Sequence, residues 1–322
     1  MRAFAIFAFA VLVTDLATAA EDPAYDTPMP FLEPMPDRDQ ADDVDLEACD
    51  SCSSSCSSVS CGTCCAPCWT ITTDAVFLSR SPLDFAALAN YFGGTQQGVR
   101  QFENQTGWQI DFIRAMSDER ELEVRCLGID GWSARGYFDV VPPTSSVARY
   151  ASKLYSAEIN VRWPRPSTPY ITWLVGFRYV ELNETFDYLQ PAPFFRRDVD
   201  TRNNMYGFQL GALLDVYDHG GPLRIDTDFR IGVYSDRMNR VEFIPGTPPV
   251  LNASTFEGTA FLGEIDVLAT WELTQRLALR VGYQMLWLDG VALASNNFLS
   301  GQNNSSGALF CHGATGGIEC TW

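Results

Sequence analysis

Charged residues alternate with apolar ones in several short segments, and this alternation is the feature of the sequence with the clearest chemical consequence. In PLRIDTDFRIGVY, the charged residues Arg224, Asp226, Asp228 and Arg230 occupy every second position. Successive side chains of a β-strand point to opposite faces, so these four charges would share one face. Such a face could line a polar channel as an electrostatic filter. It could also be filled by side chains that pair with one another, since a narrow barrel has little interior to spare.

Charged residues of the same parity recur in the other alternating segments. We predict that the following charged residues face the inside of the fold: Asp74, Asp111, Glu121, Glu123, Arg125, Glu158, Arg162, Arg178, Asp215, Arg224, Asp226, Asp228, Arg230, Glu264, Asp266, Arg280 and Glu319. Carboxylates outnumber guanidiniums in this set, so an open path past them should prefer cations.

The sequence contains two histidines, and neither indicates an enzymatic site. General acid–base catalysis uses histidine more often than any other side chain. His219 lies in the short turn DHGGP, and His312 shares the parity of Trp322 on the apolar face of its segment. Neither histidine is accompanied by a recognisable arrangement of Ser and Asp. We therefore predict no enzymatic activity, no catalytic residues and no cofactor.

Seven cysteines are concentrated in one short region. They are Cys49, Cys52, Cys56, Cys61, Cys64, Cys65 and Cys68, set among Ser and Gly. Pairs such as Cys49/Cys52 have the spacing of a thiolate metal site, but the Ser-rich segment supplies no fixed geometry for one. The thiols of an exported chain are oxidised to disulfides. We predict disulfides and no metal; the odd number leaves at least one thiol for a partner elsewhere in the chain or for a disulfide-linked cell-envelope partner.

The first 68 residues are predicted to lie outside the folded domain. Arg2 precedes an apolar run from Ala3 to Val13, and small residues follow, which is the pattern of a cleaved secretory signal over residues 1–20. The apolar run is too short to span a membrane as a helix. Residues 21–68 combine proline with eleven acidic residues and a single base, so we predict a disordered leader, acidic and then Cys-rich.

Residues 69–322 break into ten segments of strand length with period-two alternation. The segments lie near 69–80, 105–116, 120–129, 148–163, 170–182, 204–217, 223–235, 256–272, 276–288 and 308–322. The connections near 81–104, 130–147, 183–203, 236–255 and 289–307 are long, whereas MSDE, PRPSTP, DHGGP and LTQ are short. This alternation of long and short connections is typical of an up-and-down barrel in an outer membrane. We predict ten strands. A count of twelve strands would mean that one of the long connections had been misread as a loop. The first candidate is 81–104, where FAALANYF is also compatible with a short helix.

The apolar faces favour a membrane-spanning barrel over a soluble all-β fold. A soluble barrel of this size needs charged residues on its outer faces, yet Lys153 is the only lysine of the predicted barrel. Tryptophans near segment ends match the aromatic girdles that lie at membrane interfaces. The predicted girdle residues are Trp69, Trp108, Trp163, Trp271 and Trp287.

The sequence ends on an alternating segment, ALFCHGATGGIECTW, with a terminal aromatic residue. Trp322 resembles the C-terminal signal read by the barrel-insertion machinery of outer membranes, so this machinery and outer-membrane lipid are predicted partners. The net charge of −18 argues against nucleic acid as a general partner, because phosphate binding needs clustered Lys and Arg.

Closure of a ten-stranded barrel would bring its first and last segments together. Cys68 and Cys320 should then lie near each other at one rim. By parity they belong to opposite faces, Cys68 with Asp74 and Cys320 with Trp322. A disulfide needs Cα atoms within about 7 Å and converging side chains, so we predict proximity without a bridge.

Several stretches together resemble the β-barrel porin family seven, which is abundant in planctomycetes. They are WTITTDAVFLSRS, TGWQIDFIRAMSDERELEVRCLGIDGW, YSAEINVRW and HGATGGIECTW, and the resemblance covers roughly residues 66–322. It implies an outer-membrane barrel, and it supplies neither a transported substrate nor catalytic residues.

Together these observations predict an all-β fold: a membrane-spanning, up-and-down antiparallel β-barrel over residues 69–322, located in the outer membrane with its leader in the periplasm. The predicted function is that of a porin-like passive channel for small polar solutes with a weak cation preference. The alternative is a closed structural or surface-anchoring barrel whose extracellular loops bind a partner.

Overall fold

The computed structural model describes residues 69–117, 120–141, 144–165, 168–191, 194–218, 220–246 and 248–322. The predicted signal segment, the leader and its seven cysteines lie outside these residues. Within them, no helix is long and apolar enough to cross a membrane.

The described chain consists almost entirely of β-strands. They are β1 (Trp69–Arg80), β2 (Thr95–Arg100), β3 (Gln105–Ser117), β4 (Arg120–Val141), β5 (Thr144–Arg165), β6 (Thr168–Gln190), β7 (Phe195–Asp218), β8 (Leu223–Ile244), β9 (Val250–Thr274), β10 (Leu277–Val291) and β11 (Gly307–Thr321). Two helices, α2 (Phe85–Tyr91) and α3 (Ala294–Ser300), lie in the connections that precede β2 and β11.

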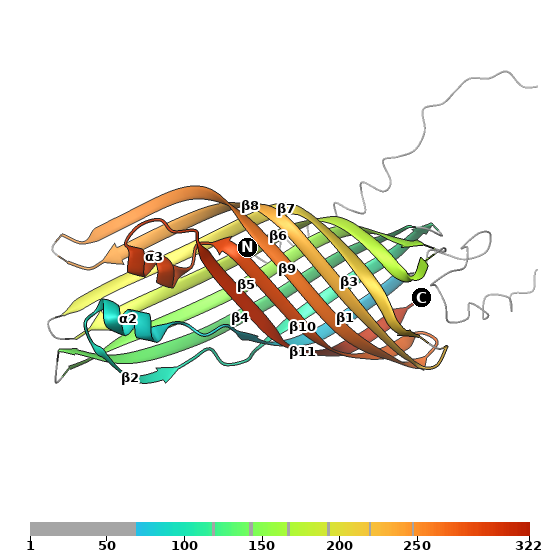
Figure 1. The fold of residues 1–322 in the computed structure, drawn as a ribbon, viewed down its shortest axis with the longest axis horizontal. Helices are drawn as coiled ribbons and strands as arrows, with labels where there is room; N and C mark the ends of the chain where they lie inside the picture. The colour runs from blue at the N-terminus through green and yellow to red at the C-terminus, as the bar shows by residue number, and fades with distance from the viewer. Residues whose placement is uncertain are drawn as a thin grey trace, which may run out of the picture. The chain divides into compact units, whose positions relative to one another are not determined.

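Ten of the strands form a closed antiparallel barrel (Figure 1), which confirms the predicted strand number. Neighbours along the chain pair with each other, and the circle closes because β1 pairs with β11 as well as β3. At this seam the N–H of Trp69 donates to the carbonyl of Trp322 at 2.7 Å. The short β2 adds outside the circle, on the far part of β4.

The strands from β4 to β9 are much longer than predicted. They contain 22 to 25 residues, against 12 to 15 in β1, β3, β10 and β11. The interpretation of 130–147, 183–203 and 236–255 as long loops was therefore wrong, since most of these residues continue the strands. The connection 81–104 contains α2 and β2, so FAALANYF does form a short helix.

The long strands keep their alternation but exchange the chemistry of their two faces part of the way along. On β6, Phe177 is exposed on the outer face, and Glu181 and Asn183 follow on that same face. The inner face changes in the opposite sense, from buried Arg178 to buried Leu182. This exchange explains the error above, because the outer half of such a strand has the polar composition of a loop.

The interior of the barrel consequently has two layers. Figure 1 shows α2 and α3 at the end opposite the C-terminus, which we call the helix end; the other is the turn end. Toward the helix end the interior is mainly apolar, with Phe138, Phe186, Leu288 and Phe298 fully buried. On the β7 and β8 side it also holds Glu242, buried between Arg197 and Arg240 at 2.5 and 2.6 Å. Nearer the turn end it is charged.

Two helices complete the apolar layer. On α2, the Asp84 carboxylate accepts a hydrogen bond from the backbone N–H of Ala87 at 2.9 Å and so caps the first turn. On α3, Phe298 packs against Phe186 with ring centroids 4.6 Å apart. The Phe92 ring, just after α2, stacks on Tyr188 of β6 at 3.8 Å. Both helices therefore contribute aromatic side chains to the layer.

Candidate functional site: the buried charge network

Arg125 of β4 lies at the centre of a group of charged side chains inside the barrel. Its Nε donates to Asp111 Oδ1 at 3.0 Å, and its Nη1 lies 3.2 Å from Glu264 Oε1. The same Nη1 is 3.4 Å from Asp266 Oδ2, and Nη2 is 3.4 Å from Asp228 Oδ2. One guanidinium thus joins carboxylates from β3, β8 and β9.

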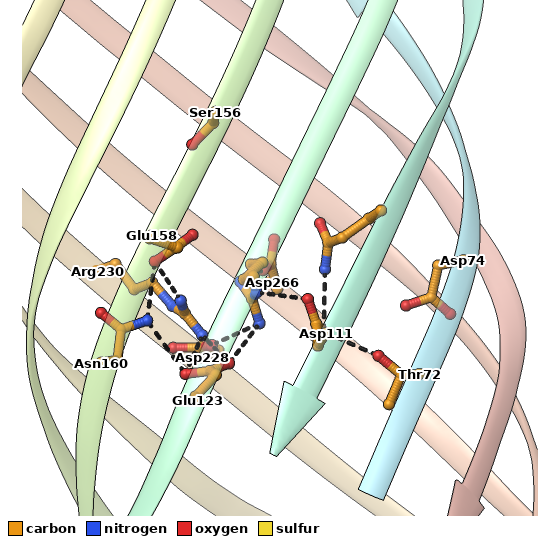
Figure 2. Close-up of polar contacts among 12 residues, drawn as sticks. Thr72, Asp74, Asp111, Glu123, Ser156, Glu158, Asn160, Asp228, Arg230 and Asp266 are labelled. Carbon is orange, nitrogen blue, oxygen red and sulfur yellow. Dashed lines mark hydrogen bonds and ion pairs between the residues drawn. The ribbon is translucent and has the colours of Figure 1, made fainter. Parts of the chain in front are cut away.

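Arg230 of β8 extends the group toward β5, as Figure 2 shows. Its Nη1 donates to Glu158 Oε2 at 2.6 Å, and its Nη2 lies 3.1 Å from Glu123 Oε1. It also donates to Asp228, two residues before it on the same strand, at 2.6 Å. Asp228 therefore receives charge-assisted hydrogen bonds from two guanidiniums, those of Arg125 and Arg230.

Arg178 of β6 completes the ionic contacts, and neutral amides occupy the remaining positions. Its Nη1 donates to Glu264 Oε2 at 2.6 Å, and its Nε donates to Ser156 at 2.7 Å. Asn160 donates to Glu158 at 3.0 Å, and the amide of Gln209 donates to the same carboxylate. These contacts connect opposite walls of the barrel across its interior.

We call the ionised part of this group the lumen network. Its members are Arg125, Arg178, Arg230, Asp111, Glu123, Glu158, Asp228, Glu264 and Asp266. No member exposes more than 6% of its side chain. Charges buried this deeply are stable only when they are paired, and removing one partner of such a pair typically costs about 3–5 kcal/mol.

The composition of the lumen network is unbalanced, with six carboxylates for three guanidiniums. Asp228 and Asp266 each have one carboxylate oxygen, Oδ1, with no hydrogen-bond partner among the described residues. The excess negative charge is therefore concentrated on the side of Arg125 that these two aspartates occupy.

The remaining residues of the predicted inward-facing set lie outside the lumen network. Asp74 of β1 is buried, 3.5 Å from Arg280, whereas Asp215 of β7 is exposed opposite Asp226. The other ion pairs are Arg224 with Asp226 at 2.7 Å, Arg280 and Arg224 with Glu319 at 3.9 Å each, and Arg162 with Glu121 at 3.6 Å.

A second ionic cluster was missed by sequence reasoning. Arg80 and Glu184 form a 2.6 Å ion pair inside the apolar layer, where the hydroxyl of Tyr150 also donates to Glu184. Burial and the neighbouring Glu184 raise the pKa of the Tyr150 hydroxyl. Glu184 also accepts from the backbone N–H of Ala294 at 2.9 Å, so it holds the first residue of α3. Glu184 lies in a segment that was predicted to be a loop, so it was not included in the inward-facing set, although it shares the parity of Arg178.

The five predicted girdle tryptophans are at least partly exposed on the barrel. Trp108, Trp271 and Trp287 are the most exposed of them. Trp69 is covered by the guanidinium of Arg114, which lies 5.1 Å from the ring centroid, and Trp163 is directly opposite Trp173. Trp322, the predicted insertion signal, follows β11 and is exposed.

The remaining candidate residues do not assemble into a site. His219 and the leader cysteines lie outside the described residues, so the proximity of Cys68 and Cys320 stays a prediction. The Nδ1 of His312 forms a 2.6 Å hydrogen bond with the hydroxyl of Tyr283. Tyr283 is exposed on the outer face. Among the described residues Cys126, Cys311 and Cys320 are free thiols, and no cluster of three metal-ligating side chains is present.

Comparisons with known proteins show a likeness of fold and nothing finer. No protein-family model matches the chain, so the assignment to β-barrel porin family seven is unsupported, and no curated protein matches either. The outer membrane protease OmpT from Escherichia coli is 11% identical, with a TM-score of 0.48 over 80% of this chain and 99% of that one. The translocator domain of the autotransporter NalP from Neisseria meningitidis is 7% identical, with a TM-score of 0.43 over 79% and 88%. The Pseudomonas putida toluene transporter TodX is 8% identical, with a TM-score of 0.35 over 80% and 90%.

The fold and its interior define the class of protein. The chain forms a closed ten-stranded antiparallel β-barrel whose interior is filled by a charged layer and an apolar layer.

Proposed function

We propose that this chain is an outer-membrane barrel that is closed to solutes and anchors a folded platform on the cell surface. The observation that carries the proposal is the exchange of chemistry between the two faces of the long strands. One part of the barrel has an apolar outside and a polar inside, as a membrane span requires. The other part has a polar outside and an apolar inside, as water requires.

The apolar outer band supports placement in a membrane. Its most exposed members include Phe208, Ile231 and Val281, at 74%, 67% and 65%. On β6 the band runs from Ile171 to Tyr179, which corresponds to about 20 Å along the barrel axis for a strand rise of about 3.3 Å and a tilt of about 40°. An apolar belt around a whole barrel is far larger than the patches that soluble monomers expose.

The filled interior supports the closed barrel over the porin-like channel. A solute moving along the axis would have to separate the ion pairs of Arg125 and Arg230, whose side chains are 6% and 1% exposed. It would then meet the apolar layer, where Phe186 and Phe298 are fully buried. Two layers in series each close the barrel.

The helix end supports the platform. The strands continue past the apolar band as an ordered sheet, and α2 and α3 are fixed to its inside. Asn203 of β7 exchanges two hydrogen bonds with the backbone of Ala292, at 2.7 and 3.0 Å. Asn297 of α3 bonds both Leu293 and Asn304 and so fixes the connection to β11. In the orientation that we propose, the helix end lies outside the cell and the turn end lies in the periplasm.

Planar-bilayer recordings of the refolded full chain test the proposal. We expect no steady conductance, because each layer alone excludes water. The double variant Arg125→Ala/Arg230→Ala opens only the charged layer, and Phe92→Ala/Phe298→Ala opens only the apolar layer. We expect both to stay closed and their combination to conduct. Heat-modifiable migration in gels verifies that each variant is folded.

A steady conductance of the unmodified chain would overturn the closed barrel and favour the porin-like channel. In that case the reversal potential in a salt gradient should show cation preference, since six carboxylates face three guanidiniums in the lumen network. Fractionation of membranes tests the location independently, and recovery of the chain outside the outer-membrane fraction would refute it.

A further inference from the structure

Three inward-facing residues of neighbouring strands form a row in the charged layer. Asp228 of β8 is in direct register with Asp266 of β9, and Asp266 is in direct register with Gln284 of β10. Their exposed fractions are 4%, 4% and 1%. Residues directly opposite on paired strands have Cβ atoms about 4.5–5.5 Å apart. The row therefore brings three oxygen-bearing side chains together inside the barrel.

Each side chain of this row has one buried oxygen without a hydrogen-bond partner among the described residues. The three atoms are Asp228 Oδ1, Asp266 Oδ1 and Gln284 Oε1. The Oδ2 atoms of the two aspartates each lie 3.4 Å from a nitrogen of Arg125, so both Oδ1 atoms are turned away from that guanidinium. The Gln284 amide donates through Nε2 to Gln109 and Glu264 at 3.3 and 3.2 Å, which leaves its oxygen as an acceptor. Three adjacent oxygens of this kind are suited to a cation.

The charge of the surroundings also favours a cation at the row. The lumen network has six carboxylates for three guanidiniums, and no member exposes more than 6% of its side chain. Buried charge is costly unless a counter-charge accompanies it. Arg125 divides its single positive charge among carboxylates of three strands, so it cannot neutralise both aspartates of the row. A divalent cation would remove most of the excess.

A proton or a water molecule satisfies the row less completely than a cation does. A protonated Asp266 donates one hydrogen bond, which reaches only one of the other two oxygens. A water molecule has two hydrogens for three oxygens and supplies no charge. A cation contacts all three oxygens at once.

The types of ligand select the class of cation. Ca²⁺ takes about six to eight oxygen ligands from carboxylates, amide carbonyls and water in flexible geometry, whereas Mg²⁺ demands a near-ideal octahedron. We propose that Asp228, Asp266 and Gln284 bind one Ca²⁺ ion inside the barrel. Two carboxylates are fewer anionic ligands than a preformed metal centre has, so water completes the coordination. The dissociation constant should then be about 0.1–1 mM, in the range of extracellular Ca²⁺ modules. This inference rests on the interior of the barrel and is independent of the proposed surface role.

Urea unfolding of the full chain, refolded in non-ionic detergent with either CaCl₂ or EDTA, tests the inference. In about 10 mM CaCl₂ the unfolding midpoint should lie about 0.5–1 M urea higher than in EDTA, because the ion binds only the folded chain. Equilibrium dialysis against radioactive calcium should find one ion per chain. Asp266→Asn removes a repelled charge, so it should fold normally in EDTA, but it should lose the midpoint shift.

The matched control is Asp74→Asn. It removes the same charge from the inward-facing set at a buried carboxylate that lies outside the row, 3.5 Å from Arg280. Its midpoint should be lower in both buffers, and the shift produced by CaCl₂ should persist.

Four outcomes would overturn the site. Equal midpoints in CaCl₂ and EDTA, with no calcium retained in dialysis, would show that the row binds no Ca²⁺. Loss of the shift in Asp74→Asn as well as in Asp266→Asn would show that interior charge in general governs the response. An equal shift in NaCl of the same ionic strength would reduce it to screening. A gain in stability in acid that Asp266→Asn abolishes and CaCl₂ leaves unchanged would assign the counter-charge to a proton. None of these readouts depends on conductance or on membrane fractionation.

Discussion

Asp228 of β8 and Asp266 of β9 are directly opposite each other in the sheet, and both lie 3.4 Å from a nitrogen of Arg125. Two carboxylates in register repel each other, so this pair depends on the guanidinium between them. Asp266 has no other ionic partner among the described residues, whereas Asp228 is also bound by Arg230. The members of the lumen network should therefore contribute unequally to the free energy of unfolding.

Substituting Arg125 should destabilise the barrel strongly. Arg125→Met leaves Asp266 without a counter-charge, opposite Asp228, which keeps only its contact with Arg230, and we expect a loss of about 3–5 kcal/mol in the free energy of unfolding. Urea titration of the refolded protein in micelles, monitored by tryptophan fluorescence, measures this change in the free energy of unfolding. A loss below about 1 kcal/mol would show that the pair does not depend on Arg125.

Neutralising single carboxylates should have unequal effects. Asp266→Asn removes a repelled charge with one weak ionic contact, so we expect a change within about 1 kcal/mol or a gain in stability. Glu158→Gln removes the negative charge from the 2.6 Å ion pair with Arg230 and should cost about 2–4 kcal/mol. The same titration ranks the two variants, and the reverse order would contradict this account of the network.

The outer band should tolerate charge according to depth. Ile231→Arg places a guanidinium within the band and should cost about 2–4 kcal/mol, whereas Ser235→Arg, four residues further along the same face of β8, should cost at most about 1 kcal/mol. Both positions are exposed, so a soluble barrel would accept the two substitutions equally. Equilibrium unfolding in lipid vesicles distinguishes the two cases.

Stability should depend on pH through Asp236, which lies beyond the outer band. Burial raises the pKa of this carboxyl to about 7, and a backbone contact with Asn204 opposes the shift only partly. The folded chain then binds more protons than the unfolded chain between about pH 4 and 7. Stability should therefore fall as the pH rises through this window, by at most about 1.4 kcal/mol per pH unit.

Asp236→Asn provides the control for this pH dependence. The amide cannot ionise, so the variant should be more stable than the unmodified chain at pH 8 and should lose this component of the slope. Unfolding titrations at pH 5 and pH 8 on both proteins measure the difference. Parallel curves would show that Asp236 is not the group responsible.

The apolar layer should loosen locally when its central ring is removed. Phe298 is fully buried against Phe186, and Arg197 lies over its ring at 4.5 Å. Phe298→Ala should release α3 and expose residues 292–306 to limited proteolysis, while the barrel strands stay protected. Ser300→Ala, at the exposed end of the same helix, should leave the cleavage pattern unchanged.

The alternating segments predict the fold because strand parity is a local property. The alternation around Arg230 indicates a strand whatever surrounds it, and the short turns between segments indicate antiparallel neighbours. Parity also placed Glu123, Glu158 and Arg230 on one face, but it could not show that their ends meet across the barrel. That depends on the diameter of the closed circle, which no single segment encodes.

The half of the long strands toward the helix end was misread for a physical reason. Residues such as Glu181 and Asn183 are polar because they face water, and a polar run following an apolar strand resembles a loop. The residues on the opposite parity show that this polar run is still a strand. Leu182 and Phe186 are apolar because they face a second core inside the barrel. The Arg80–Glu184 pair was lost with that half, because its two members are brought together by closure of the barrel.

In the proposed membrane placement, the exchange of chemistry between the faces of the long strands also sets the depth of the barrel in the bilayer. If the barrel sank by one pair of residues, Glu181 and its neighbours would enter hydrocarbon. If it rose by the same amount, Phe177 and its neighbours would face water. Both displacements are opposed around the circumference, on every long strand at once. The barrel therefore stays at one depth in the bilayer. The platform is thereby held at a constant height above the lipid, without any contact that measures it.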